Sequence, residues 1–360
     1  MDIRRLLRAD IDELEEYTPV KPLEVLAAEI GVPVERLVKL DANENLYGAP
    51  EAVFTAIAGA DLHIYPDPSQ TALRKAIASF AGVSPEQVVA GTGADDLIDI
   101  LLRLTLPEAV VIPTPAFGMY SFLARISQAK PIEVPRGPGF ELDVAAVRAA
   151  VEESGAKVVF VTSPNNPTGN PLSRAEVEEL CALEALIVVD EAYIEFGGET
   201  AVPLIAGHPN LVVLRTFSKW AGLAGLRVGY AIATPELARE MMAIKQPYNV
   251  SVAADVGARA AIEHRGEVFE TVRCIVAERE RMSQRLAAFD WLEPLPSAAN
   301  FVLVRVLGRE ARSVRDGLRK RGVLIRYYDR PDLANYIRIS TGRPEDTDRL
   351  IEALHSLEDE

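Results

Sequence analysis

The sequence predicts an α/β protein in which a large domain is joined to a smaller one. Short apolar runs alternate along the chain with amphipathic stretches, a pattern typical of strands and helices built around a largely parallel sheet. A length of 360 residues, of which 49% are hydrophobic, exceeds what one small core requires. We therefore expect one large sheet between helices and a second, smaller sheet.

Strands of the large sheet are expected where apolar runs end in polar or glycine-rich loops. These runs are residues 88–90, 109–112, 157–161, 186–189, 211–214 and 230–233. Helices are expected between them, and a long helical stretch ends near Leu286. The second sheet is expected from residues 301–306, 323–326 and 336–340.

The order of these elements predicts three parts of the chain. Residues 1–44 form an N-terminal arm, which begins with a helix-like charged stretch, and part of the small domain. Residues 45–247 form the large domain, and residues 248–360 form the rest of the small domain. The arm has too little apolar surface to fold alone, so we expect it to pack on the body or on a partner subunit.

Composition and charge argue against several classes of protein. The formal net charge of −15 at pH 7 disfavours nucleic-acid binding, because no basic stripe would offset repulsion from phosphate. We therefore expect small molecules or another subunit as partners. No apolar run approaches the length needed to span a membrane, and the charged residues 1–16 are unlike a signal peptide, so a cytoplasmic protein is expected.

The cysteines and histidines show no disulfide or metal pattern. Cys181 and Cys274 are far apart in the sequence and have no Cys-x-x-Cys spacing. The four histidines are scattered without the spacing of metal ligands. We therefore expect neither a disulfide framework nor a metal site.

The segment TFSKWAGLAGLR, Thr216–Arg227, follows one of the expected strands. Lys219 would then lie at the C-terminal edge of the sheet, where α/β proteins bind their ligands. A partly desolvated lysine near other cations can lose its proton and act as a nucleophile. Arg227 could hold a phosphate or lower the pKa of this lysine. An ordinary surface lysine is the alternative interpretation.

A glycine turn, GTGADD at residues 91–96, follows another expected strand and opens a helix. Such a turn directs backbone N–H groups and the helix dipole toward an anion, which makes the turn a candidate for holding a phosphate. The third glycine of the dinucleotide fingerprint is missing. A plain connection between strand and helix is the alternative.

Three further loops at strand ends carry candidate ligand groups. Phe117 could stack on a flat ring or fill the core. Asn166 lies in a loop stiffened by two prolines, which can aim an amide side chain. Asp190 ends a fully apolar run, where it either caps the next segment or serves a buried positive partner.

Three candidates lie outside these loops. Tyr17 belongs to the N-terminal arm, Asn43 follows a short strand, and Tyr65 lies on a rigid loop framed by prolines. Each could contact a ligand, and packing or a turn is the alternative in each case.

These loops, taken in order, resemble the fold-type I pyridoxal-phosphate aminotransferases and, within them, the histidinol-phosphate aminotransferase group. The most specific motifs are SPNNPTG at Ser163–Gly169, VVDEAY at Val188–Tyr193, and TFSK with GLAGLR at Thr216–Arg227. The resemblance extends from Tyr17 to Arg343. It implies a mainly parallel seven-stranded sheet between helices in the large domain, and a smaller α+β domain.

The resemblance also implies roles in binding pyridoxal 5′-phosphate. Lys219 would bond to the cofactor and then move a proton to or from the substrate α-carbon. Asp190 would keep the pyridine nitrogen protonated, so that the ring withdraws electrons. Tyr193 and Asn166 would hydrogen-bond to the phenolic oxygen. Phe117 would stack on the ring, in place of the tyrosine that many relatives have there.

The cofactor phosphate would be held by groups from several loops. They are the backbone at Gly93, Ala94 and Asp95, the side chains of Thr216, Ser218 and Arg227, and Tyr65 of a neighbouring subunit. The last of these implies a homodimer with shared sites.

The strand YIRIS and its continuation TGR, Tyr336–Arg343, match the part of the family that binds substrate anions. Arg338 would clamp a carboxylate with two parallel hydrogen bonds. Arg326 would be a second cation, with a salt bridge as the alternative, and Tyr17 and Asn43 would close the pocket.

The resemblance implies transfer of an amino group between L-histidinol phosphate and 2-oxoglutarate in histidine biosynthesis, since the same arginines can meet a phosphate or a carboxylate. A broader aromatic-amino-acid aminotransferase is one alternative, because imidazole and phenyl rings need similar apolar walls. A decarboxylase related to the threonine-phosphate enzyme is another. A regulatory protein without catalysis and a nucleotide-dependent oxidoreductase are more distant alternatives.

Overall fold

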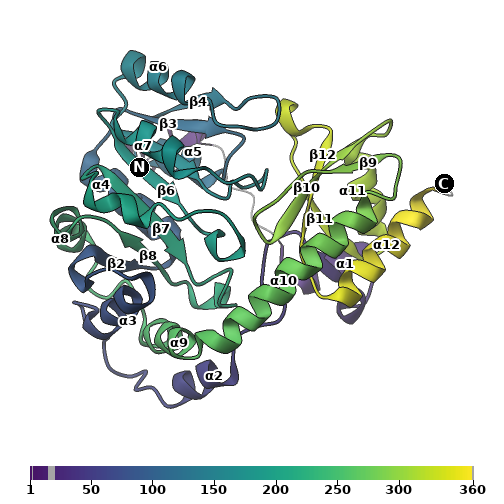
Figure 1. Ribbon diagram of the computed structural model, residues 1–360, viewed down its shortest axis with the longest axis horizontal. Helices are drawn as coiled ribbons and strands as arrows, with labels where there is room; N and C mark the ends of the chain where they lie inside the picture. Colours follow the sequence, from purple (N-terminus) through teal and green to yellow (C-terminus); the bar gives the residue numbers. More distant parts are fainter. Residues whose placement is uncertain (2, 15–20, 359–360) are drawn as a thin grey trace.

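The computed structural model describes residues 1, 3–14 and 21–358, and these residues form two sheets joined by a long helix (Figure 1). The larger sheet has seven strands in the order β2-β8-β7-β6-β5-β3-β4. Only β8 runs antiparallel to its neighbours. The predicted α/β fold with a mainly parallel seven-stranded sheet is thus confirmed. The strands are β2 (Val88–Gly91), β3 (Ala109–Thr114), β4 (Lys130–Pro135), β5 (Val158–Thr162), β6 (Leu186–Asp190), β7 (Leu211–Thr216) and β8 (Gly229–Ile232).

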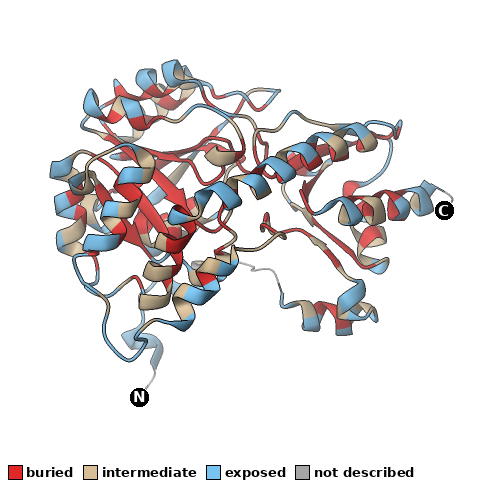
Figure 2. Ribbon diagram, turned by 60° about the horizontal axis from the view of Figure 1, so that its bottom comes forward, coloured by how far each residue is buried: buried red, intermediate tan, exposed pale blue. Residues whose placement is uncertain are grey.

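The inner strands of this sheet are buried on both faces, because helices cover each side (Figure 2). Strands covered in this way read as continuous apolar runs, which is why the sequence reveals them. The helices of this part are α2 (Glu51–Ala58), α3 (Thr71–Ala81), α4 (Gly93–Thr105), α5 (Met119–Ile126), α6 (Val144–Ser154), α7 (Arg174–Cys181), α8 (Pro235–Ile244) and α9 (Val252–Glu263).

The smaller sheet has five strands in the order β1-β11-β12-β10-β9. The strands are β1 (Val38–Leu40), β9 (Leu292–Pro294), β10 (Phe301–Val306), β11 (Val323–Tyr327) and β12 (Tyr336–Ser340). Its helices are α1 (Leu23–Ile30), α11 (Ala311–Lys320) and α12 (Pro344–Glu358). Because β1 pairs in parallel with β11, residues 38–40 join the small sheet.

The helix α10 (Arg265–Leu286) crosses from one sheet to the other (Figure 1). Its residues Val268, Val272 and Ile275 pack in the core of the large sheet together with α9. Met282 and Leu286 pack in the core of the small sheet. A boundary at residue 247 separates α9 from the core against which it packs. We therefore propose that the large domain continues through Ile275.

Short 3-10 helices connect several elements. They are Ile3–Leu6, Ile11–Glu13, Val34–Arg36, Pro85–Gln87, Ile194–Phe196, Val202–Ala206, Ala224–Leu226 and Pro331–Leu333. The helix-like pattern of residues 1–16 therefore yields, in its described part, two 3-10 helices and not one α-helix. The arm reaches the large domain, because Arg8 donates hydrogen bonds to the carbonyl oxygens of Ile126 (2.6 Å) and Arg125 (3.2 Å) at the end of α5.

Candidate active site

A cavity of about 190 Å³ lies at the C-terminal ends of the central parallel strands. Strands β5, β6 and β7 and the start of α4 each contribute a loop to it, so the side chains that end neighbouring strands meet at one edge of the sheet. The lining residues include Ala94, Asp95, Phe117, Asn166, Asp190, Tyr193, Thr216, Ser218, Lys219 and Arg227. Ten of the predicted site residues therefore share one cavity.

The amine of Lys219 lies inside this cavity. Its Nζ donates a hydrogen bond to the carbonyl oxygen of Ala42 at 3.2 Å and lies 5.9 Å from the centre of the Tyr193 ring. Burial, with the positive charge of Arg338 nearby, lowers the pKa of Lys219 to about 8. The unprotonated fraction of this amine near neutral pH is therefore far larger than for an ordinary lysine, and the unprotonated form is the nucleophile.

Asp190 ends β6 and faces the same cavity from the sheet. Its Oδ2 accepts a hydrogen bond from the Tyr120 hydroxyl at 2.6 Å, and its Oδ1 accepts one from the backbone N–H of Ala192 at 2.9 Å. Burial raises the pKa of Asp190 to about 6, although these two hydrogen bonds oppose the shift. The carboxylate is therefore fixed in orientation and suited to a buried cation.

A chain of hydrogen bonds links the cavity to the small sheet. The Tyr193 hydroxyl accepts from Asn166 Nδ2 at 3.3 Å and from Asn43 Nδ2 at 3.1 Å. Asn166 Oδ1 accepts from Arg338 Nη1 at 2.7 Å, and Asn43 Oδ1 accepts from the Ser340 hydroxyl at 2.8 Å. Both domains thus contribute to one polar network. Burial raises the pKa of Tyr193 to about 12, so its hydroxyl keeps its proton.

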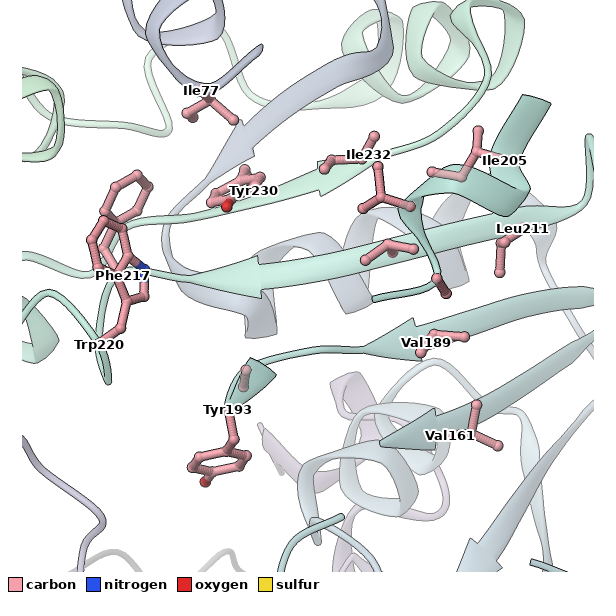
Figure 3. Packing of buried hydrophobic residues seen from close by; sticks show 14 of the residues in the cluster. Ile77, Val161, Val189, Tyr193, Ile205, Leu211, Phe217, Trp220, Tyr230 and Ile232 are labelled. Carbon is pink, nitrogen blue, oxygen red and sulfur yellow. The ribbon is translucent and has the colours of Figure 1, made fainter. Parts of the chain in front are cut away.

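Figure 3 shows Tyr193 beyond the end of its strand, next to the apolar core that supports the site. Its ring packs edge-on against Phe301 at the start of β10, with ring centres 5.2 Å apart. On the neighbouring loop, Phe217 and Trp220 flank Ser218 and Lys219 and are fully buried. These apolar anchors restrict how the lysine and the tyrosine can move.

One end of the cavity is built to hold an anion. Helix α4 begins there without a side-chain cap, and its residues Ala94 and Asp95 line the cavity, so uncapped N–H groups of its first turn are available to an anion. Arg227 Nη2 lies 3.2 Å from Asp95 Oδ2, and the hydroxyl oxygens of Thr216 and Ser218 are 2.9 Å apart. Gly93 has a φ of +81°, and a Cβ there would lie 2.7 Å from Arg227 Nη2. The positive φ favours glycine here, and a side chain would also displace the Arg227 guanidinium.

A second cavity of about 370 Å³ adjoins the first. The residues that line both are Ala42, Phe117, Asn166, Tyr193 and Lys219. Arg326, Arg330 and Arg338 line the second cavity. Arg338 is 5% exposed and forms no ion pair among the described residues, and its Nε lacks a hydrogen-bond partner there. A buried guanidinium without a carboxylate is suited to receiving an anionic group of a substrate.

Two predicted site residues lie apart from these cavities. Tyr65 is 79% exposed and stacks on Tyr248, with ring centres 4.7 Å apart. It does not line either cavity of its own chain, so a role for it would require another copy of the chain. Tyr17 lies outside the described residues.

Sequence reasoning missed Tyr120, Glu44 and Arg330. Tyr120 holds Asp190, Glu44 lines the first cavity, and Arg330 lines the second. Tyr120 lies in α5 with no sign in the sequence that it faces β6. Glu44, in contrast, directly follows the predicted site residue Asn43, and its position in a polar loop was an available signal.

A model of the family aminotransferase class I and II matches residues 35–354. The chain belongs to this aminotransferase family. The histidinol-phosphate aminotransferase of Roseiflexus castenholzii is 49% identical to it, and the match covers 98% of each chain.

Solved structures resemble this aminotransferase over nearly its full length. The histidinol-phosphate aminotransferase of Sinorhizobium meliloti, solved in complex with pyridoxal-5′-phosphate, gives a TM-score of 0.86 at 30% identity, covering 94% of this chain and 96% of the other. The L-threonine-O-3-phosphate decarboxylase of Porphyromonas gingivalis gives a TM-score of 0.79 at 23% identity, covering 90% and 100% of the two chains. The second likeness shows the shared fold alone.

Two further properties concern the described part of the aminotransferase. None of its helices is both long and apolar enough to cross a membrane. No group of three or more His, Cys, Asp or Glu side chains there could hold a metal ion.

Proposed function

We infer that this aminotransferase exchanges an amino group between L-histidinol phosphate and 2-oxoglutarate in histidine biosynthesis, with pyridoxal 5′-phosphate as its cofactor. The observation that supports this most directly is the pair of joined cavities. Lys219 and Asp190 line the first, and Arg338 lines the second and donates a hydrogen bond to Asn166, which lines both. The names of the relatives from Roseiflexus castenholzii and Sinorhizobium meliloti support the same substrate.

The first cavity has the chemical groups that pyridoxal phosphate needs. The N-terminus of α4, with Thr216, Ser218 and Arg227, would receive the phosphate. Asp190 would meet the pyridine nitrogen, Tyr193 and Asn166 would meet the phenolic oxygen, and Phe117 would cover the ring. When bound, the cofactor supplies an electron sink that stabilises negative charge at the substrate α-carbon.

The side chains of this protein would then perform the remaining steps. Lys219 is the group that attacks as an amine and later carries a proton to or from the α-carbon, since its pKa of about 8 lies near working pH. Asp190 would hold its negative charge toward the ring nitrogen. Tyr193 keeps its hydroxyl proton and presents it as a fixed hydrogen-bond donor.

The second cavity would bind the rest of the substrate. Histidinol phosphate carries its phosphate ester on the carbon next to the amine-bearing carbon, and glutamate carries its α-carboxylate in the same relation. Arg338 can therefore meet either anion, with Arg326 as the second cation. Tyr17 and Asn43 are proposed to close this pocket.

The visible absorption spectrum tests this function. We expect the purified protein with pyridoxal phosphate to absorb in the visible, to lose that band on addition of histidinol phosphate, and to regain it with 2-oxoglutarate. A band that responds only to aromatic amino acids would favour the broader aminotransferase. Release of carbon dioxide without an oxo acid would favour a decarboxylase, whereas no band at all would contradict the role of Lys219.

We also propose that the enzyme is a homodimer with shared sites. Tyr65 is exposed, and it lines one surface hollow together with the exposed side chains of Leu62, Ile64 and Tyr248; such an apolar patch suits a partner surface. Mixing Lys219→Ala subunits with Tyr65→Ala subunits should restore activity, because one mixed site would contain both native residues. Mixed subunits that exchange and stay inactive would contradict shared sites. The cytoplasmic location stays a prediction.

A further inference from the structure

Strand β1 and the loop that follows it carry three charged residues that have no role in the proposed reaction. Lys39 Nζ donates a hydrogen bond to Glu44 Oε2 and lies 3.3 Å from Asp41 Oδ1. One lysine is therefore shared by two carboxylates. We call these three residues, Lys39, Asp41 and Glu44, the β1-loop cluster; its net charge with all groups ionised is −1.

The β1-loop cluster lies where the two cavities meet. Glu44 lines the first cavity and Asp41 lines the second. Ala42, between them in the chain, lines both and accepts the hydrogen bond from Lys219 Nζ. The buried Oδ1 of Asp41 accepts no hydrogen bond among the described residues, despite its ion pair with Lys39. The cluster therefore retains capacity for another cation.

Several other charges of the two cavities have partners of their own. Arg227 pairs with Asp95, and Arg330 pairs with Asp332 at 2.6 Å outside the cavity. In the proposed function Asp190 meets the cofactor nitrogen, and Arg338 meets the substrate anion. The amino group of the substrate, which reacts beside Lys219, has so far been given no partner. An amino donor arrives mainly as an ammonium ion. Lys219, Arg326 and Arg338 would repel it. Of the other carboxylates, Asp95 is paired with Arg227 and Asp190 is held by Tyr120 and Ala192.

We propose that Glu44, held in place by Lys39, is the negative charge that receives the ammonium group of the amino donor beside Lys219. This inference rests on the proposed function, because it assigns Glu44 to the donor of that reaction. Glu44 acts as a positioning residue. It attracts the cationic amine and offsets the repulsion from Lys219 and Arg338.

The charges around Lys219 support this assignment. Arg338 from β12, Lys39 from β1 and Arg227 all lower the pKa of Lys219, and Glu44 raises it. Asp95 at the start of α4 also interacts with Lys219, and Arg227 offsets its charge. Loss of the Glu44 carboxylate should therefore disfavour any ammonium at this position.

The test compares Glu44→Gln with Asp99→Asn, which removes a carboxylate from an exposed ion pair with Arg103. In the cofactor-free full-length protein, acetic anhydride labelling of Lys219 across a pH series, read by mass spectrometry, reports when the amine loses its proton. We expect Glu44→Gln to move that midpoint to lower pH. Asp99→Asn should leave it unchanged.

The two half-reactions give a second measurement, because the amino donor carries an ammonium and the oxo acid does not. We expect Glu44→Gln to raise the KM for the amino donor about threefold to tenfold, equivalent to half a unit to one unit of pKa. The KM for 2-oxoglutarate should stay the same. Glu44→Asp, which keeps the charge, should recover part of the loss.

An unchanged labelling midpoint would overturn the proposal, as would equal losses with the donor and the oxo acid. L-Glutamate should be used as donor beside histidinol phosphate. If glutamate reacts and histidinol phosphate does not, the proposed substrate fails, while the effect of Glu44 on glutamate and on Lys219 labelling still decides the present proposal.

Discussion

Arg215 and Glu191 form a buried ion pair directly beneath the active site. Arg215 Nε donates to Glu191 Oε2 at 2.9 Å, and Arg215 Nη2 lies 2.8 Å from the same oxygen. Arg215 precedes Thr216 on β7, and Glu191 follows Asp190 on β6. The pair therefore joins the strand ends that carry the proposed phosphate and pyridine contacts.

We expect Arg215→Gln to destabilise the protein strongly. Glu191 is fully buried, so the substitution would leave its carboxylate without a cation, at a cost of about 3–5 kcal/mol. Arg239→Gln breaks an exposed pair with Glu240 and should change stability by less than about 1 kcal/mol. Chemical denaturation of both variants checks this, and equal stabilities would show that the buried pair contributes little.

Glu195 should make the folded protein less stable as the pH rises. Neither of its buried carboxylate oxygens has a hydrogen-bond partner in the described structure, and burial raises its pKa to about 7. The folded state thus holds the proton of Glu195 more tightly than the unfolded state, in which the pKa of this group is near 4.5. The ionised carboxylate therefore lowers the free energy of unfolding. This loss is absent below about pH 4.5, grows with rising pH, and reaches its full size above about pH 7.

Glu195→Gln should remove this penalty. Relative to the unmodified protein, we expect the variant to gain on the order of 2–3 kcal/mol at pH 8 and almost nothing at pH 4.5. Unfolding curves at these two pH values measure the difference. A gain that is the same at both would mean that Glu195 does not titrate between them.

Gly93→Ala should weaken cofactor binding more than it weakens the fold. A Cβ at residue 93 would displace the guanidinium of Arg227, and the positive φ adds backbone strain of about 1 kcal/mol. Gly266 lies in α10 with no heavy atom within 4 Å of an added Cβ, so Gly266→Ala is the matched control. Titration with pyridoxal phosphate should show weaker affinity for the first variant alone.

Asp190→Asn should abolish most transamination without unfolding the protein. Asparagine retains an acceptor for the Tyr120 or Ala192 hydrogen bond and removes a buried charge, so thermal stability should fall little or rise. The half-reaction with amino donor should slow by on the order of 10²-fold or more, because a preorganised charge is lost. Asp255→Asn on α9 serves as the control, and similar rates in both would argue against the role of Asp190.

Local patterns predicted much of this protein because they report burial directly. Strands such as β5 and β7 are covered on both faces and therefore appear as apolar runs. Edge strand β4 was missed, since its side chains are mostly exposed or half-buried and two of its residues are prolines. The helix-like pattern of residues 1–16 wrongly suggested an α-helix, because the spacing of apolar residues does not show what a short segment packs against.

The amino-acid sequence by itself determined which groups lie at the ends of strands. Lys219, Asp190 and Asn166 each lie at or beyond the end of an apolar run, and neighbouring residues alone are enough to recognise such a run as a buried strand. Only the tertiary structure decided which distant groups meet them. Arg338 reaches Asn166 across 172 positions of sequence, and Ser340 reaches Asn43 across 297. The physical reason is that such contacts arise when two separately formed cores dock, and no local periodicity records that geometry.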